Sequence, residues 1–391
     1  MRERMVYIAA VVLFTLTLTG CSTTKQTLSQ ADINNLLVDH AFEGYNTVFV
    51  ESENDIYSLD QAMIDFVHGS IMMEEDAFAR SQMLLKKLFY SSPTELRYLN
   101  GANLTARQAF HQNTANCLSL TILAYALAKE AQLDIQFQEI DIPEYWVRSG
   151  DYNLLTGHVN LKVIGDSHNN YRVVWGGKTT TIDFDPYVVK QHFAKNVISR
   201  KRVTAMFYNN KGAQYLVQGD HKSAYAYFKA AITHDPSFSA VWGNIGLLYK
   251  QVGLTDRAEQ AYLAAVVLDD ANLNAWTNLA ILLSQEGRVT EAADIHRFID
   301  KSRQSNPYYF ALLGDEAYHQ GDYEQSIYYY KKADNMLEQQ HEFYFGLSRS
   351  YYQLGDMTRA ERYLAKAKQA ANFDDIKRRY QSKLNLLTRL P

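Results

Sequence analysis

The sequence has few cysteines, no long run of basic residues and no metal-binding spacing, and each shortage excludes a class of protein. Only two cysteines occur among 391 residues, so at most one disulfide could form and a disulfide framework is excluded. The net charge is −4 and no long basic run occurs, which leaves no argument for a nucleic-acid partner. No HxxxH or HExxH spacing occurs, and we therefore expect no metal and no other cofactor.

The composition and the first residues indicate a globular, exported protein. Hydrophobic residues make up 47% of the chain and charged residues 21%, which is typical of packed domains. Arg2 and Arg4 precede an apolar run from Met5 to Thr19 that is too short to span a membrane comfortably. This pattern predicts a signal peptide.

The apolar run ends in Leu18-Thr19-Gly20-Cys21, which resembles the lipobox of bacterial lipoproteins. The resemblance implies that residues 1–20 are a signal peptide, that Cys21 carries a lipid, and that residues 21–45 are a tether. Ser22 implies delivery to the outer membrane, with the protein facing the periplasm. An ordinary signal peptide, cleaved at the same place, is the alternative.

Cys117 opens an apolar stretch, ending at Leu133, that contains neither Pro nor Gly. We expect one helix, with Asn116 as its N-cap and Cys117 in its first turn. There the helix dipole favours the thiolate, which is the form that attacks carbonyls. Lipidation of Cys21 would leave Cys117 without a disulfide partner in an oxidising compartment. The alternative is that Cys117 is a small buried hydrophobe.

The residues before and after this helix predict an α+β domain over 46–200. Ser58 and Thr105 are each followed three residues later by Gln, a capping-box pattern that predicts a helix start. After Leu133 the apolar period changes to two, which predicts a strand that ends near Pro143.

A loop is expected at 144–157, and alternation returns from His158 to Val163. Further strands are expected at 171–175 and 179–184. Helices followed by an antiparallel sheet are typical of the α+β class.

The order of three short motifs resembles the transglutaminase-like, papain-related superfamily. They are Asn116-Cys117-Leu118-Ser119, Gly157-His158-Val159-Asn160 and Thr181-Ile182-Asp183-Phe184. The resemblance implies that Cys117 is the nucleophile, that His158 moves its proton, and that Asp183 orients the imidazole. Asp185 remains an alternative to Asp183, because both lie on one face of an alternating strand. For the oxyanion, the backbone N–H of Cys117 is a better candidate than Gln112.

Such a triad implies a cysteine peptidase or a transglutaminase-like acyltransferase that acts on peptide or amide bonds. Hydrolysis and acyl transfer pass through the same thioester, so the motifs do not separate them. The alternative is a degenerate, inactive scaffold, because function depends on the site rather than on the fold.

Five glycines in the second half are spaced by 34 residues, the period of the tetratricopeptide repeat. They are Gly219, Gly253, Gly287, Gly321 and Gly355. In repeats starting at 205, 239, 273, 307 and 341, the fourth residue is aromatic and the twentieth is Ala or Ser. We therefore expect an all-α solenoid of five repeats, 205–238, 239–272, 273–306, 307–340 and 341–374, closed by a capping helix at 375–391.

The repeat family implies a groove lined by the first helix of each repeat, which binds a protein or peptide partner. Its expected lining is Leu216, Leu247, Ile281, Tyr318 and Tyr352, with Asn210, Asn244 and Asn278 nearby. The groove has no cluster of Lys and Arg to hold a peptide carboxylate. The alternative is that these residues pack on the cysteine-bearing domain.

Overall fold

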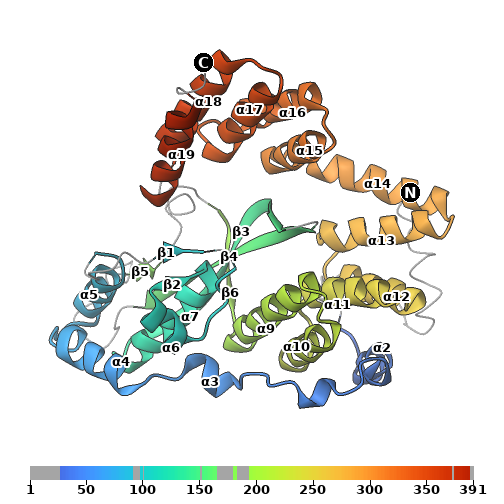
Figure 1. Cartoon of the computed structure of the whole chain (residues 1–391). Helices are drawn as coiled ribbons and strands as arrows, with labels where there is room; N and C mark the ends of the chain where they lie inside the picture. Colours follow the sequence, from blue (N-terminus) through green and yellow to red (C-terminus); the bar gives the residue numbers. More distant parts are fainter. Residues whose placement is uncertain are drawn as a thin grey trace, which may run out of the picture. The chain divides into compact units, whose positions relative to one another are not determined.

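The computed structural model describes residues 27–90, 97–99, 101–149, 152–164, 179–182, 193–371 and 374–387 (Figure 1). Cys21, Asp183, Asp185 and the strand expected at 171–175 lie outside these residues. The chain divides into two compact units, one formed by residues up to 56 with 199–299, the other by 57–198 with 300–391. Among the described residues, no helix has both the length and the apolar character needed to cross a membrane.

Helical hairpins make up most of the first unit. They are built from α9 (Arg200–Val217), α10 (His221–His234), α11 (Ser239–Gln251), α12 (Thr255–Leu268) and α13 (Leu273–Gln285). The next helix, α14 (Val289–Arg303), runs across the boundary between the units. Gly219 and Gly253 turn the chain between paired helices with φ of 78° and 79°, a conformation that glycine adopts without strain.

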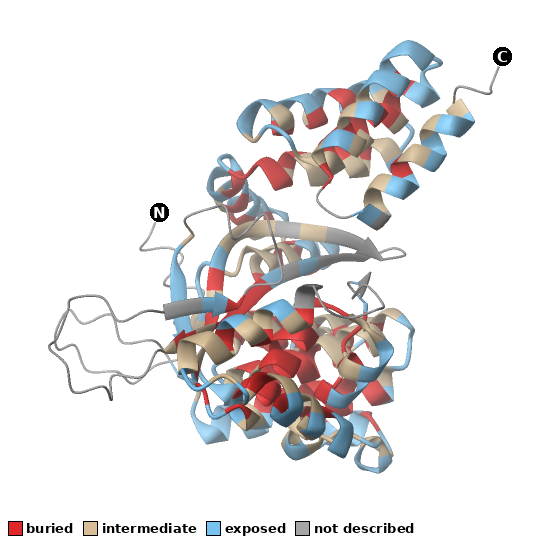
Figure 2. Ribbon diagram, turned by 90° about the vertical axis from the view of Figure 1, so that its left-hand side faces the viewer, coloured by how far each residue is buried: buried red, intermediate tan, exposed pale blue. Residues whose placement is uncertain are grey.

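The second unit contains α15 (Pro307–His319), α16 (Tyr323–Met336), α17 (His341–Gln353), α18 (Met357–Ala370) and α19 (Asp374–Leu387). In Figure 2 the helices near the C-terminus carry buried residues on one side and exposed ones on the other, as amphipathic helices do. The prediction of tetratricopeptide-like helical repeats is confirmed, while the exact domain boundaries stay a prediction.

An N-terminal strap, residues 29–56, packs on the first hairpins. It contains α2 (Gln30–Leu36), two 3-10 turns, η1 (Asp39–Ala41) and η2 (Tyr45–Thr47), and the start of α3 (Glu53–Tyr57). The ring of Phe42 stacks on Tyr225 with centroids 4.2 Å apart, and the hydroxyl of Tyr249 donates to the carbonyl of Leu36 at 2.9 Å. Part of the stretch assigned to a tether therefore lies against the repeats.

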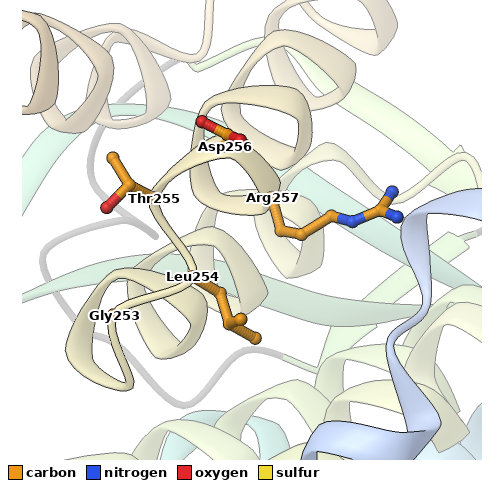
Figure 3. A pocket seen from close by; sticks show the side chains of 5 residues that line it. All are labelled: Gly253, Leu254, Thr255, Asp256 and Arg257. Atoms are coloured by element: carbon orange, nitrogen blue, oxygen red, sulfur yellow. The ribbon is translucent and has the colours of Figure 1, made fainter.

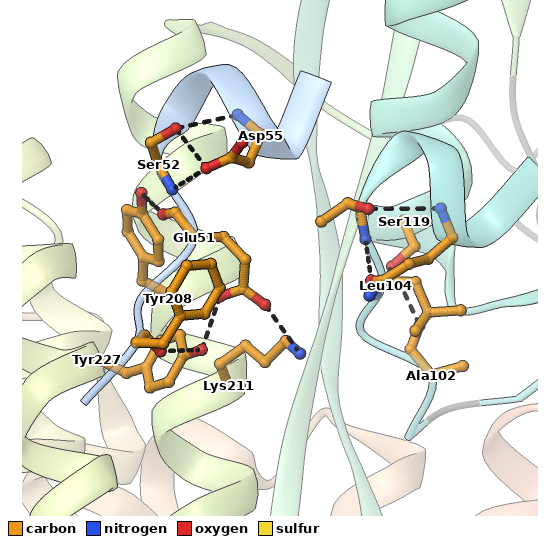
Figure 4. A network of polar contacts seen from close by, with 12 residues as sticks. Glu51, Ser52, Asp55, Ala102, Leu104, Ser119, Tyr208, Lys211 and Tyr227 are labelled. Carbon is orange, nitrogen blue, oxygen red and sulfur yellow. Dashed lines mark hydrogen bonds and ion pairs between the residues drawn. The ribbon is translucent and has the colours of Figure 1, made fainter. Parts of the chain in front are cut away.

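Acidic residues of the strap are held by tyrosines and lysines of the repeats. Glu51 accepts the hydroxyl of Tyr227 at 2.6 Å and pairs with Lys211 at 3.4 Å (Figure 4). Burial raises the pKa of Asp39, but hydrogen bonds from Lys229 and Tyr225 outweigh it, so the pKa lies below its usual value.

Before the sheet, the second unit has helices α4 (Gln61–Phe66), α5 (Ala77–Tyr90), α6 (Ala106–Gln112) and α7 (Cys117–Glu130), with a π-helical turn, η3 (Val67–Ile71). The capping box at Thr105 is confirmed at the start of α6. The start predicted at Ser58 is wrong, because Asp60 caps α4 by accepting the N–H of Met63. Asp accepts this bond as well as Ser does, so two candidates, Ser58 and Asp60, competed within three residues.

The antiparallel sheet has the order β5-β4-β3-β6, from β3 (Asp134–Ser149), β4 (Tyr152–Ile164), β5 (Thr179–Ile182) and β6 (Lys195–Ile198). A second pair, β1 (Arg97–Tyr98) and β2 (Thr114–Ala115), is parallel. Helix α7 packs on β3 and β4, with the ring of Tyr125 stacked on Phe137 at 4.4 Å.

The loop expected at 144–157 is wrong, because β3 extends to Ser149 and β4 begins at Tyr152. The pairing shifts register between Ile140 and Tyr145 and then continues to Ser149 opposite Tyr152. Pro143 lies in the shifted segment, where its missing N–H removes no ladder hydrogen bond. Pro143 therefore marks an irregularity in the strand and not its end.

Candidate functional site

The start of α7 presents Cys117 as the sequence predicts. The side chain of Asn116 accepts the N–H of Ser119 at 2.8 Å, which confirms it as the N-cap. Cys117 is the first residue of the helix and is partly exposed. The thiol therefore lies at the positive end of the helix dipole with access to solvent.

Two side chains of α7 reach the backbone of β4 on either side of His158. The thiol of Cys117 donates to the carbonyl oxygen of Gly157 at 3.9 Å. The hydroxyl of Thr121 lies 3.1 Å from the carbonyl oxygen of Val159 and 2.8 Å from that of Cys117. Residues 117 and 121 share one helix face, and carbonyls 157 and 159 point to one side of the strand. The first turn of α7 is therefore fixed against the strand segment that carries His158.

His158 is 3% exposed and lies opposite Ile140 in the hairpin. Asn160, two residues on and therefore on the same face of β4, is fully buried, and Val159 on the opposite face is 5% exposed, so β4 is buried on both faces at this point. Asp183 and Asp185 lie outside the described residues, and the Cys-His-Asp triad as a whole stays a prediction. Gln112 is exposed at the end of α6.

Ser119 fixes the loop that precedes α6, and sequence reasoning gave it no role. Its hydroxyl donates to the carbonyl of Ala102 at 3.0 Å and accepts the N–H of Leu104 at 2.7 Å (Figure 4). The N–H of Asn116 also donates to the carbonyl of Ala102, at 3.1 Å. Three hydrogen bonds thus hold residues 102–104 against the start of α7.

In the first unit, the first helices α9, α11 and α13 lie beside one another and repeat an asparagine at the same position. Asn210, Asn244 and Asn278 are all partly exposed. Asn244 donates to the side chain of Asn209 at 2.8 Å. Within the described part of the chain, the amides of Asn210 and Asn278 have no hydrogen-bond partner.

The apolar residues predicted for the groove differ in exposure. Ile281 is 38% exposed and Leu247 is partly exposed, whereas Leu216 is buried at 3%. Leu216 therefore offers a partner little surface.

In the second unit, Tyr318 is already engaged by an arginine that the sequence analysis did not single out. The guanidinium of Arg349 lies 4.2 Å from the ring centroid of Tyr318 and pairs with Asp315. It also donates to the hydroxyl of Tyr330 at 2.8 Å. Burial lowers the pKa of Arg349 to about 10. Of the two groove residues predicted for this unit, Tyr352 is 40% exposed.

A hollow of about 300 Å³ lies at the turn between α11 and α12, lined by Gly253, Leu254, Thr255, Asp256 and Arg257 (Figure 3). Arg257 donates to the carbonyl of Asn35 at 2.8 Å and to Gln260 at 3.1 Å. Because these contacts use its guanidinium, we assign no ligand to the hollow.

Comparison with known families agrees with the helical hairpins. A family model described as the C-terminal domain of cilia and flagella-associated protein 70, a tetratricopeptide-type model, matches residues 189–382. The chain contains a tetratricopeptide-like repeat domain. Domains of this kind present extended surfaces that bind other proteins.

Solved structures similar to the tetratricopeptide-like domain include MamA, 21% identical, with 43% of this chain and 91% of that chain covered and a TM-score of 0.25. Pseudomonas aeruginosa PilF is 17% identical over 48% and 94% of the two chains, with a TM-score of 0.29. A Parabacteroides merdae tetratricopeptide repeat protein is 17% identical over 47% and 71%, with a TM-score of 0.33. No curated protein matches the sequence.

Proposed function

We propose that this protein is a protein-binding module of the bacterial cell envelope, whose tetratricopeptide-like repeats hold an extended segment of a partner protein. The observation that carries the proposal is the asparagine repeated on α9, α11 and α13, where the amides of Asn210 and Asn278 have no hydrogen-bond partner among the described residues. An amide offers a donor and an acceptor, which match the C=O and N–H groups of a peptide backbone.

The spacing of these helices supports an extended partner segment. Neighbouring packed helices lie about 8–10 Å apart, and an extended chain advances about 3.3 Å per residue. Each asparagine would therefore meet the partner backbone at every third residue. Leu247 and Ile281 would contact apolar side chains of the partner, since both are partly exposed.

The test uses the two amides that make no hydrogen bond to the described residues. A photo-reactive residue at position 281 would capture and identify the partner in cells, and calorimetry would then measure the affinity of the captured segment. Asn210→Ala with Asn278→Ala should weaken binding roughly tenfold or more and leave stability unchanged. Arg297→Gln, at a surface ion pair of α14, is the control. Equal affinity of the double variant and the control would reject the asparagine surface.

A second candidate function rests on Cys117, whose thiol contacts the carbonyl of the residue before His158. In this proposal the domain is transglutaminase-like, and the Cys117 thiolate attacks the carbonyl carbon of a peptide or amide to form a thioester. His158 takes the thiol proton and returns it to the leaving amine, while Asp183 or Asp185 orients the imidazole. Water or a second amine then resolves the thioester. The rival proposal is an inactive scaffold that supports only binding.

The rate of Cys117 alkylation by iodoacetamide against pH separates the two proposals. An activated thiol should react with an apparent pKa well below about 8.5, and His158→Gln should raise it. His158→Ala is the second variant. It removes the ring entirely, but it also leaves a cavity because His158 is buried, which is why His158→Gln comes first. An ordinary thiol profile that neither variant changes would support the scaffold.

The location in the envelope rests on the lipobox-like Leu18 to Cys21 and the following Ser22. We propose a lipid on Cys21 that holds the protein at the outer membrane, facing the periplasm. Metabolic labelling with a palmitate analogue should mark the protein, and Cys21→Ser should abolish the mark and release it from membranes. A label that persists in Cys21→Ser would reject the anchor.

A further inference from the structure

Glu144 of β3 forms a buried ion pair with Arg303, at the end of α14. The guanidinium Nε lies 2.7 Å from one carboxylate oxygen and a terminal nitrogen lies 2.9 Å from the other, which is a bidentate pair. The side chain of Arg303 is 5% exposed and that of Glu144 is 20% exposed. Asn306 also donates to the carbonyl of Glu144 at 2.9 Å.

Two aromatic rings lie near the guanidinium of this ion pair. The guanidinium carbon of Arg303 lies 4.9 Å from the ring centroid of Trp146 and 5.7 Å from that of Tyr309. Trp146 packs against the apolar core formed by α15 to α19. We call Glu144, Trp146, Arg303, Asn306 and Tyr309 the latch.

The latch holds one arm of the β3–β4 hairpin, and the other arm carries His158. Ile140 opposite His158 is the last regular pair before the register shift, and Tyr145 opposite Thr156 is the first pair after it. Glu144 therefore lies at the end of the irregular segment, four residues from the partner of His158. On the opposite edge of β3, the N–H of Asp141 donates to the carbonyl of Ala194 at 2.9 Å.

We infer that the latch couples the repeats of the second unit to the strand that carries His158. A bulge is the place where a strand can change its pairing, so an atom fixed at its end sets the register of the segment that follows. A protein bound to α15 and α17 would act on the pairing of Ile140 with His158 through Glu144. By reciprocity, a change at His158 would alter binding at those helices. This coupling depends on neither the chemistry of Cys117 nor the asparagine surface of the first unit.

Hydrogen–deuterium exchange of the full-length chain tests the coupling. Glu144→Gln keeps the shape of the side chain and removes the charge that the buried guanidinium of Arg303 pairs with, which is costly in a buried ion pair. We expect amides of residues 137–140 and 158–163 to exchange roughly tenfold faster or more, together with those of α15. The control Arg297→Gln removes an exposed ion pair from the same helix as Arg303 and should change none of these rates.

A milder variant keeps the test decisive if Glu144→Gln does not fold. Arg303→Lys keeps the cation but loses the planar fork, and it should speed exchange at the same amides by roughly threefold. Faster exchange confined to residues 144–149 and α15, with residues 158–163 unchanged, would reduce the latch to a local contact and reject the coupling. Unchanged exchange in both variants would reject it as well.

Discussion

In helices α9 to α12, two glycines lie directly against aromatic rings, whereas short polar side chains join separate segments in the described part of residues 101–164. A Cβ on Gly212 would lie 2.6 Å from the ring of Phe228, and one on Gly246 would lie 2.7 Å from the ring of Tyr262. Around α7, Ser119 and Thr121 instead bond to backbone groups 15 to 38 residues away. The repeats are thus specified by residue size at a fixed spacing, and the sheet-bearing segment by hydrogen bonds between separate segments.

The largest effect is expected at the fourth position of a repeat, where a large aromatic side chain should contribute strongly to the free energy of unfolding. Trp242 is fully buried and its indole N–H donates to the carbonyl of Pro236 at 2.9 Å. Trp242→Ala should lower the free energy of unfolding by about 3–5 kcal/mol in urea denaturation. Trp276, at the same position of the next repeat, is only partly buried, so Trp276→Ala is the matched control and should lose less. Equal losses of unfolding free energy would show that the position in the repeat, and not the burial of the ring, sets the contribution of this residue to stability.

A second comparison uses two glycines of α11. Gly246→Ala places a methyl group against the buried ring of Tyr262 and should destabilise the protein by about 1–3 kcal/mol. Gly243→Ala meets only Ala275 at 3.8 Å, so the gain in helix propensity should stabilise by about 0.5–1 kcal/mol. The difference in urea midpoint between the two variants is the measurement. Higher stability in both variants would show that the ring of Tyr262 moves aside to accept the methyl group.

If hydrogen bonds specify the sheet-bearing segment, removing one hydroxyl there should cost about as much unfolding free energy as the methyl group added at Gly246. Ser119→Ala leaves the N–H of Leu104 without its acceptor and should lower the free energy of unfolding by about 1–3 kcal/mol. Ser382→Ala removes an exposed hydroxyl that bonds within α19 and should change stability by less than about 0.5 kcal/mol. If thermal unfolding does not distinguish the two variants, hydrogen bonds do not specify this segment.

The smallest effect concerns left-handed residues at helix ends. Gly253→Ala forces Ala to a φ of 79° and should destabilise by about 1 kcal/mol. Gln132, after α7, holds a φ of 57° without being glycine, so Gln132→Gly should stabilise by about 0.5–1 kcal/mol. Thermal denaturation measures both. Changes of the same sign would contradict the difference in backbone strain.

Local signals in the sequence were enough for some elements and misleading for others. The capping box at Thr105 and the N-cap at Asn116 are confirmed, because each is satisfied within three residues. The helix start at Ser58 failed since Asp60 was an equal competitor nearby. Pro143 suggested a strand end, but the missing N–H is accommodated where β3 shifts register against β4.

For the candidate sites, the sequence predicted Cys117 at a helix start but no role for Ser119, Thr121 or Arg303. The bonds of Ser119 and Thr121 cross to other segments, and Arg303 meets Glu144 across 159 residues of chain. A partner at that distance leaves no periodic trace in the sequence.

The sequence by itself determined the tetratricopeptide-like repeats, because five glycines recur every 34 residues and each unit has an aromatic residue at its fourth position and Ala or Ser at its twentieth. It also determined that Cys117 begins a helix, since Asn116 caps it from the adjacent position. Only the tertiary structure decided that α7 lies against the strand of His158 and that Glu144 holds β3 to Arg303. The physical reason is that a buried donor, acceptor or charge must be satisfied by whichever group the fold brings within hydrogen-bonding distance, however far along the chain that group lies.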